Sequence, residues 1–360
     1  MGSNHSVQIN IHPDRANLFY FAGETVSGTI NVHINEEHIK LDEIILLLAG
    51  ESGYTTTRAV TDSNGTMRRD TEYHTISFLK SRMIIESPPL GQKYLIYNPG
   101  DYSWRFDIPL PSQLPPSLNQ PRSYPHVRYY LKLVMDKPWY KHNVREFLYL
   151  TVFPRIDLLQ SAQLPTPTMF SKQNRKDVIL RGSMNKLAYL PGELITGTLE
   201  VNNPRRSLLK RIELSLTQFY EIESKTKQEK IIHTILPIVD HRNDEHIMGK
   251  FSVAIPFLPL PPSYNFHHGY DHKTQVNVHY DLEFQVKVEG TFTNFDISLP
   301  VTILSDSNTN SNSYESRQTT NFPPNSLPHY SEIDIEDETD PPPSYDSIAF
   351  PNYLHEYLRE

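Results

Sequence analysis

The chain has 360 residues, a formal net charge of −8 and no cysteine. Without cysteine, the protein cannot hold disulfides, thiolate zinc sites or iron–sulfur clusters, and it cannot carry a thioester. No run reaches the roughly 18 apolar residues of a membrane-spanning helix, and the N-terminus lacks the layout of a secretory signal. We therefore expect a soluble cytoplasmic chain.

Charge is distributed unevenly along the chain. Residues 305–360 hold 11 acidic and two basic side chains, so this segment carries −9 and the remainder about +1. A near-neutral body does not predict a nucleic-acid partner.

An internal repeat organises the first 300 residues. Residues 20–32 and 189–201 share the pattern aromatic-x-x-Gly-Glu-x-Val/Ile-x-Gly at a constant offset of 169. Three later segments recur in the same order, namely 106–109 with 253–256, 114–117 with 260–263, and 127–133 with 278–284. The repeat predicts two copies of one domain.

Each copy has the period of β-structure. Apolar residues occupy every second position in 7–11, 212–216 and 276–286, as in half-buried strands. Gly23 and Gly192 stand where a turn leads into a strand, and the 29 prolines disfavour long helices. We predict an all-β protein of two tandem antiparallel β-sandwiches of immunoglobulin type, with roughly seven strands each.

Domain boundaries follow from the repeat. We predict a first sandwich over residues 1–154, a connection over 155–172 and a second sandwich over 173–304. Residues 305–360 begin with polar low-complexity sequence that cannot bury enough apolar surface to fold, so we predict a disordered acidic tail.

The tail contains a motif with a binding mechanism, Pro342-Pro343-Ser344-Tyr345. Consecutive prolines favour the polyproline II helix, which has three residues per turn, so Pro342 and Tyr345 project from one side and fit a WW domain. Leu327, Pro328 and Tyr330 form a second candidate upstream, and two sites on one tail would engage tandem WW domains. A solvated proline-rich spacer is the alternative. The identical segment at 261–264 occupies a repeated position, which indicates a structural loop.

These features together resemble the α-arrestins, the arrestin-domain-containing proteins. The resemblance rests on the repeated Gly-Glu pattern, the Trp-x-Phe-x-Ile-Pro strand at 104–109 and the tail motif, and it covers residues 7–303 for the fold. It implies arrestin N- and C-domains over 1–154 and about 173–304.

The resemblance also implies a function. It predicts a non-enzymatic trafficking adaptor that links a membrane transporter or receptor to a WW-domain ubiquitin ligase of Nedd4 type. The adaptor would promote ubiquitination, endocytosis and sorting, and would be recruited from the cytoplasm to the plasma membrane and endosomes. A ligase-independent arrestin-fold sorting or signalling scaffold is the alternative.

The candidates that the sequence offers for contact with cargo are clustered basic residues, namely Arg205, Arg206, Lys210 and Arg211. Arginine can hold an acidic or phosphorylated segment through bidentate contacts, although solvated strand-edge charge is the alternative. The acidic run at 332–340 is another candidate occupant of this cluster.

The N-terminus and the histidines complete the candidates. Gly2 lies in an N-myristoylation pattern, which would give peripheral membrane contact; an ordinary flexible terminus is the alternative. The histidine-rich loop at 267–272 lacks zinc-site spacing, and no phosphate loop or nucleophile elbow is present. We therefore expect no metal, no cofactor, no catalytic residue and a monomeric protein.

Overall fold

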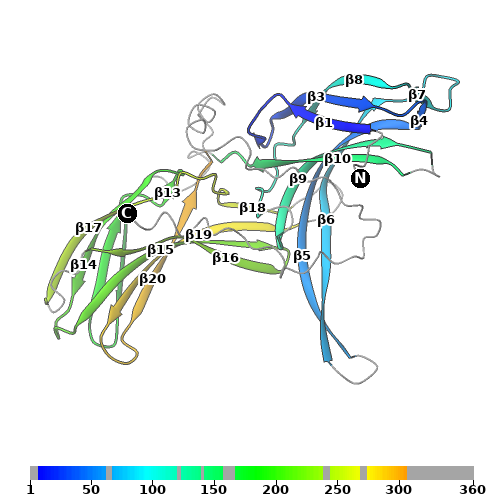
Figure 1. Ribbon diagram of the computed structural model, residues 1–360. Coiled ribbons are helices and arrows are strands. Elements are labelled where there is room, and N and C mark those ends of the chain that lie inside the picture. The colour runs from blue at the N-terminus through cyan, green and yellow to red at the C-terminus, as the bar shows by residue number, and fades with distance from the viewer. Residues whose placement is uncertain are drawn as a thin grey trace. The chain divides into compact units, whose positions relative to one another are not determined.

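The computed structural model describes residues 7–61, 67–119, 123–138, 142–156, 167–237, 244–267 and 274–305 (Figure 1). In these ranges the regular elements are β-strands, which confirms the all-β prediction. No helix in the described ranges is long and apolar enough to cross a membrane.

The first sandwich consists of β1 (Val7–Pro13), β2 (Phe19–Phe21), β3 (Thr25–Ile34), β4 (Ile39–Leu41), β5 (Glu43–Thr61), β6 (Met67–Glu86), β7 (Leu95–Tyr97), β8 (Gly100–Pro109), β9 (His126–Asp136) and β10 (Val144–Phe153). One sheet has the order β1-β3-β8 and the other β2-β10-β9-β5-β6, while β4 and β7 form a small pair. Alternate residues of β3, β5 and β9 are buried, so their apolar side chains form the core between the sheets.

The second sandwich consists of β11 (Thr168–Gln173), β12 (Ile179–Met184), β13 (Ala188–Tyr189), β14 (Leu194–Asn202), β15 (Leu209–Ile222), β16 (Lys225–Leu236), β17 (His246–Ala254), β18 (Tyr264–Phe266), β19 (Val276–Val288) and β20 (Phe295–Ile303). Its sheets have the orders β11-β12-β14-β17 and β13-β20-β19-β15-β16, and β18 also pairs with β19. The second order repeats that of β2-β10-β9-β5-β6, including the parallel pairing of the short first strand.

Strand β11 lies largely in the stretch that the sequence assigns to the connection between domains. Its Phe170 is buried and stacks on Phe284 with ring centroids 5.0 Å apart. The connection therefore contains a strand of the second sandwich, because this ring completes the core beneath β19. The repeat gives no sign of it, since β11 precedes the repeated segments.

The repeated Gly-Glu pair builds the same turn in both sandwiches. The Glu24 amide donates to the Phe21 carbonyl (3.1 Å), and the Glu193 amide donates to the Leu190 carbonyl (3.1 Å). Gly23 has φ +85° and its counterpart φ +86°, the left-handed value that a type II turn needs at its third residue. Each carboxylate then accepts the amide at the start of its turn, at 2.9 Å from Phe21 and 2.8 Å from Leu190. The glycine supplies the conformation and the glutamate satisfies the free donor.

A repeated serine fastens each proline-rich loop to the last long strand of its sandwich. Ser117 donates its amide to the Val152 carbonyl (2.8 Å), and its hydroxyl accepts the Val152 amide (2.9 Å). Ser263 makes the same pair of bonds with Ile303, at 2.8 and 3.0 Å. The serine thus continues the ladder where the proline before it has no N–H to donate.

A repeated tyrosine holds the prolines of the same loops. The Tyr129 hydroxyl donates to the Pro115 carbonyl (2.6 Å), and the Tyr280 hydroxyl donates to the Pro261 carbonyl (2.6 Å). Burial raises the pKa of both tyrosines, so the hydroxyls remain donors. The segment 261–264 is therefore part of the fold, as its repeated position indicates.

Polar contacts also join residues of the first sandwich to residues of the second. The Ser52 and Thr274 hydroxyls lie 2.8 Å apart and are buried, and Thr274 donates to Glu223 Oε1 (2.6 Å). Asn119 Nδ2 donates to the Tyr220 hydroxyl (2.7 Å). Because the hydroxyl of Thr274 donates to the carboxylate, Ser52 is the donor to Thr274.

Candidate functional site

The structure describes only some of the predicted site residues. The two candidate WW ligands (Pro342, Pro343, Tyr345 and Leu327, Pro328, Tyr330) and the lipidation candidate Gly2 lie outside the described residues. Most of the histidine-rich loop also lies outside them. Among the residues that are described, no group of three or more metal-ligating side chains is placed to hold an ion. The basic cluster at 205–211 is described, and it leads to one end of the second sandwich.

Three connections meet at this end, which follow β11, β14 and β19. Lys176 donates to the Glu289 carbonyl (2.7 Å), and the Glu289 amide donates to the Leu208 carbonyl (2.9 Å). Arg205 adds an ion pair to Asp177 (2.5 Å). Residues far apart in the sequence therefore form one surface, which we call the basic end.

An asparagine shapes the first of these connections. Asn174 Oδ1 accepts the amides of Lys176 (2.9 Å) and Val178 (3.0 Å), which is the turn that an Asx side chain favours. Its Nδ2 donates to the Thr293 carbonyl (2.7 Å) across to the β19–β20 connection. The turn is fixed by side-chain bonds, so the residues that it presents are held in place.

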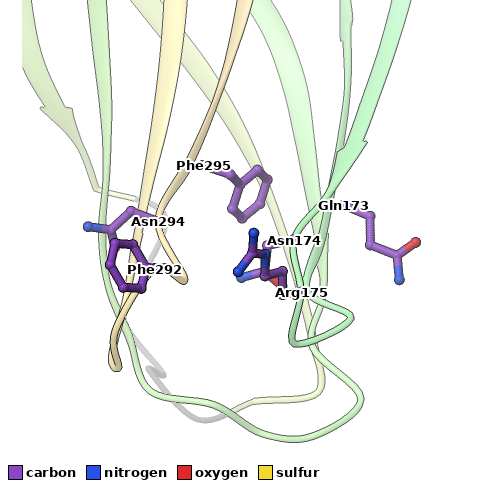
Figure 2. Close-up of a pocket in the computed structure, with 6 residues that line it drawn as sticks. All are labelled: Gln173, Asn174, Arg175, Phe292, Asn294 and Phe295. Atoms are coloured by element: carbon purple, nitrogen blue, oxygen red, sulfur yellow. The ribbon is translucent and has the colours of Figure 1, made fainter.

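Between these connections lies an open cleft of about 450 Å³, lined by Gln173, Asn174, Arg175, Phe292, Asn294 and Phe295 (Figure 2). Phe292 is 83% exposed and has φ +58°, an uncommon conformation for a bulky side chain. Arg175 is exposed and makes no hydrogen bond or ion pair with the residues that the structure describes. The cleft offers an unpaired cation beside an exposed aromatic ring.

Two of the predicted cargo contacts at the basic end are already paired within the chain. Arg205 lies 2.5 Å from Asp177, and Arg206 lies 3.6 Å from Glu245. Both pairs are exposed, so each contributes little to stability and an incoming anion can compete for the arginine. The pairs nevertheless lower the net charge that the cluster presents.

The other two residues of the cluster differ from each other. Arg211 pairs with Glu213, and this contact lowers the pKa of the Glu213 carboxyl below its ordinary value. Lys210 is exposed and has no partner among the described residues. The free cations of the basic end are thus Lys210 and Arg175.

Sequence reasoning missed Arg175 and Phe292. Arg175 belongs to a short charged turn whose lysine and aspartate serve the fold, and Phe292 looks like one apolar residue near a strand. Only the pairing of β11 and β20 with their neighbours brings the two connections together. The sequence signal that could have pointed to Phe292 is an aromatic residue placed between a glycine and an asparagine in the turn of a hairpin.

Two family matches describe this architecture. Residues 9–159 match the arrestin (or S-antigen) N-terminal domain, and residues 174–308 match the arrestin C-terminal domain. A search of curated proteins finds no match. The first match covers most of β1 and all of β2 to β10, and the second covers β12 to β20 but not β11.

Proposed function

Because the chain belongs to the arrestin family, we propose that it is an adaptor of the α-arrestin type, which links a membrane transporter or receptor to a WW-domain ubiquitin ligase of Nedd4 type. The ligase docks on Pro342, Pro343 and Tyr345 in the segment that follows the second domain. Leu327, Pro328 and Tyr330 supply the second, weaker contact. The chain itself takes no catalytic part.

The observation that carries this proposal is a contrast between two identical Pro-Pro-Ser-Tyr segments. At 261–264 the Pro261 carbonyl accepts the Tyr280 hydroxyl (2.6 Å), and Ser263 makes two bonds to Ile303. Pro262 is buried. A WW domain would have to break these contacts, so the fold accounts for this copy, and the proposal therefore assigns the ligase to the copy at 342–345.

The connection between β8 and β9 supports the α branch of the family. It is rich in proline, and its described residues, 110–119 and 123–125, contain no helix. Cargo contact is assigned to the basic end, where Lys210 and Arg175 are unpaired and Arg205 and Arg206 can exchange partners.

Binding of tandem WW domains to the full chain tests the proposal. Replacement of the anchor side chain in Tyr345→Ala should weaken binding about tenfold or more, which corresponds to roughly 1.4 kcal/mol. Tyr330→Ala should have a smaller effect, and the double variant should abolish binding. Tyr353→Ala, in the same acidic tail, is the matched control and should bind like the native chain.

The opposite result also has a clear meaning. If the native chain does not bind WW domains, ligase recruitment is wrong and the ligase-independent arrestin scaffold replaces it. Cargo would then be sought on the two sandwiches without reference to the tail motif.

A further inference from the structure

The chain contains two pairs of adjacent arginines, and a hydroxyl residue follows each pair closely. The pair at 68–69 lies three and two residues before Thr71, and the pair at 205–206 directly precedes Ser207. Protein kinases select their substrates partly by charge, and acidic side chains of the kinase can hold arginines that precede the acceptor hydroxyl. Both hydroxyls are therefore candidates for phosphorylation, and their surroundings decide between them.

The fold holds Ser207 in place. Its amide donates to Asn203 Oδ1 (2.9 Å), and its carbonyl accepts Asn203 Nδ2 (2.8 Å), so both of its backbone groups serve the turn. The two arginines before it are occupied by carboxylates of the same chain, and Ser207 is partly buried. A kinase would have to dismantle this turn to reach the hydroxyl, which makes Ser207 the poorer candidate.

The surroundings of Thr71 are more open. Thr71 lies on β6, the edge strand of its sheet, and no other described strand pairs with the free side of β6. Its side chain is exposed, and its hydroxyl makes no hydrogen bond with the described part of the chain. The acceptor group is thus free and reachable from solvent.

Around Thr71 the chain forms a ribbon of only two strands. Strand β9 accompanies β5 as far as Gly53, and beyond it β5 and β6 continue as a pair in which Thr57 lies opposite Thr71 (Figure 1). A two-stranded hairpin is marginally stable, and such an element opens locally more easily than the core of a sheet. A kinase can therefore separate residues 68–71 from β5 without unfolding the sandwich.

The two faces of the ribbon differ in charge, because side chains alternate along a strand. Arg68 and Asp70 project on one face and lie 2.6 Å apart, so their charges compensate each other. Arg69 and Thr71 project on the other face, where Arg69 is exposed and makes no hydrogen bond or ion pair with the described residues. The other described residues of this face are uncharged, namely Thr55, Thr57, Ala59 and Thr61 on β5 and Met67, Tyr73 and Thr75 on β6.

Both arginines before Thr71 are available to a kinase. Arg69 is free, and in the pair of Arg68 with Asp70 the side chains are 77% and 38% exposed. A surface pair of this kind contributes little to stability, so an acidic side chain of the kinase can replace Asp70.

We propose that Thr71 is a phosphorylation site for a protein kinase that selects arginine two and three residues before the acceptor. The kinase transfers the γ-phosphoryl group of ATP. A bond forms between Thr71 Oγ1 and the phosphorus, the bond to the ADP oxygen breaks, and the hydroxyl proton passes to the catalytic aspartate of the kinase. The site does not depend on ligase recruitment.

The modification would reverse the charge that one face of the ribbon presents. Arg69 gives this face a charge of +1, and a phosphate adds about −1.5 to −2 at pH 7. The net charge of the face therefore becomes about −0.5 to −1. A partner that binds the face in one state should be repelled by the other.

Treatment of the full chain with ATP and the catalytic subunit of cyclic-AMP-dependent protein kinase tests the site. Tandem mass spectrometry of the tryptic fragment 70–80 locates the phosphate, and we expect Thr71 to be the main modified residue. Thr71→Ala should remove this phosphate. Thr71→Ser keeps a hydroxyl and should retain it, which excludes misfolding as the cause of the loss.

Substitution of the arginines makes the test specific. Arg68→Ala/Arg69→Ala should lower the initial rate at Thr71 about tenfold or more, because two charge-assisted contacts to the kinase are lost. Arg181→Ala, at an exposed position on β12, is the matched control for charge and should leave the rate unchanged. Thr57→Ala, opposite Thr71, is the control for the ribbon and should also leave it unchanged.

Three results would overturn the proposal. An unmodified full chain, tested beside a peptide of residues 67–75 that the kinase does modify, would mean that the folded ribbon withholds Thr71. A main phosphate on Ser207 would mean that the other arginine pair directs the kinase. A rate that is unchanged in Arg68→Ala/Arg69→Ala would mean that the arginines play no part. Because the assay contains no WW domain, none of these results bears on ligase recruitment.

Discussion

The two sandwiches use the same turn with different ionic partners. Glu24 binds two arginines, Arg15 (2.7 Å) and Arg155 (2.6 Å), whereas Glu193 binds only Lys186 (2.7 Å) among the described residues. The backbone bonds of the two turns agree within 0.1 Å in length. The turn is therefore a property of glycine geometry and of the carboxylate–amide bond, and the ion pairs are additions that have diverged.

The sandwiches also differ in their longest hairpin. Strand β9 pairs with β5 only as far as Gly53, while β5 and β6 continue to Thr61↔Met67 (Figure 1). In the second sandwich β19 accompanies β15 to Ile222. The first sandwich thus extends a two-stranded ribbon without a covering layer, which explains why Met67 is exposed.

Acid should destabilise the first sandwich more than the second, and this is the largest difference that we expect. His126 is buried, its Nδ1 lies 2.7 Å from the Ser123 carbonyl, and its Nε2 has no partner among the described residues. Burial, with a smaller contribution from the Arg128 charge, lowers the pKa of His126 to about 4. The equivalent residue of the repeat is Asn277, which does not titrate.

The sign follows from linkage. The unfolded chain binds a proton near pH 6.5 and the folded chain near pH 4, so this contribution to stability is complete above pH 6.5 and is lost as the pH falls to 4. The loss is about 3 kcal/mol. Both tryptophans, Trp104 and Trp139, fall in the segment that matches the N-terminal domain. Urea unfolding at several pH values, followed by tryptophan fluorescence, therefore measures the stability that the first sandwich loses. In His126→Asn this part of the pH dependence should disappear; an unchanged profile would mean that burial does not set the pKa.

The second largest effect should come from the carboxylates of the turns. Glu24→Gln retains an acceptor for the Phe21 amide but loses two charge-assisted bonds, which should cost about 1.5–3 kcal/mol. Glu193→Gln loses a single charge-assisted bond, which is more exposed to solvent, and should cost less than about 1 kcal/mol. The loss of stability in Glu24→Gln is measured by urea unfolding with tryptophan fluorescence. The loss in Glu193→Gln is measured by hydrogen exchange of the β14 amides. Glu37→Gln, at an exposed position without a described partner, is the control. Equal losses would show that the second arginine adds nothing.

The sequence contained enough information for the plan of the fold. The repeated glutamate, serine and tyrosine make the same bonds in both halves, and the repeated glycine has the same φ, so their recurrence predicted two copies of one sandwich. The basic end was harder to predict, because the partners of Arg205 and Arg206, Asp177 and Glu245, lie 28 and 39 residues away. A sequence shows which residues are charged, but which of them come close enough to form ion pairs depends on how the strands pair.

Alanine at the turn glycines should give a smaller effect that differs between the copies. Both glycines have φ near +85°, where a side chain costs about 1–2 kcal/mol. At Gly23 the nearest neighbour of a new Cβ is Ser112 at 3.8 Å, whereas at Gly192 it is the Phe257 ring at 2.5 Å. Gly192→Ala should therefore cost more than Gly23→Ala. Because Phe257 is 56% exposed and can move, the excess should be small, and Phe257→Ala should remove it. If the excess remains, the backbone and not the ring is its cause.

The smallest expected effect concerns the contact between the two sandwiches. Ser52→Ala and Thr274→Val each remove one partner of a buried hydroxyl pair, and their coupling in a double-mutant cycle should be about 1 kcal/mol. Glu223 retains the Gln275 amide (3.0 Å), so Thr274→Val does not leave the carboxylate without a donor. The free energies of unfolding in the cycle are measured by tryptophan fluorescence. This signal reports the unfolding of the first sandwich, although one of the two substituted residues lies in the second.

The control is the hydroxyl pair of Ser183 and Thr198, which are also 2.8 Å apart but exposed and within one sandwich. Water replaces either hydroxyl there, so the coupling should be below about 0.5 kcal/mol and should not reach the tryptophans. A coupling near zero at Ser52 and Thr274 would mean that the two sandwiches unfold independently in spite of this bond. A coupling near 1 kcal/mol would mean that the duplicated domains, which differ in the ion pairs of their turns and in their longest hairpin, share part of their stability through a buried hydroxyl pair.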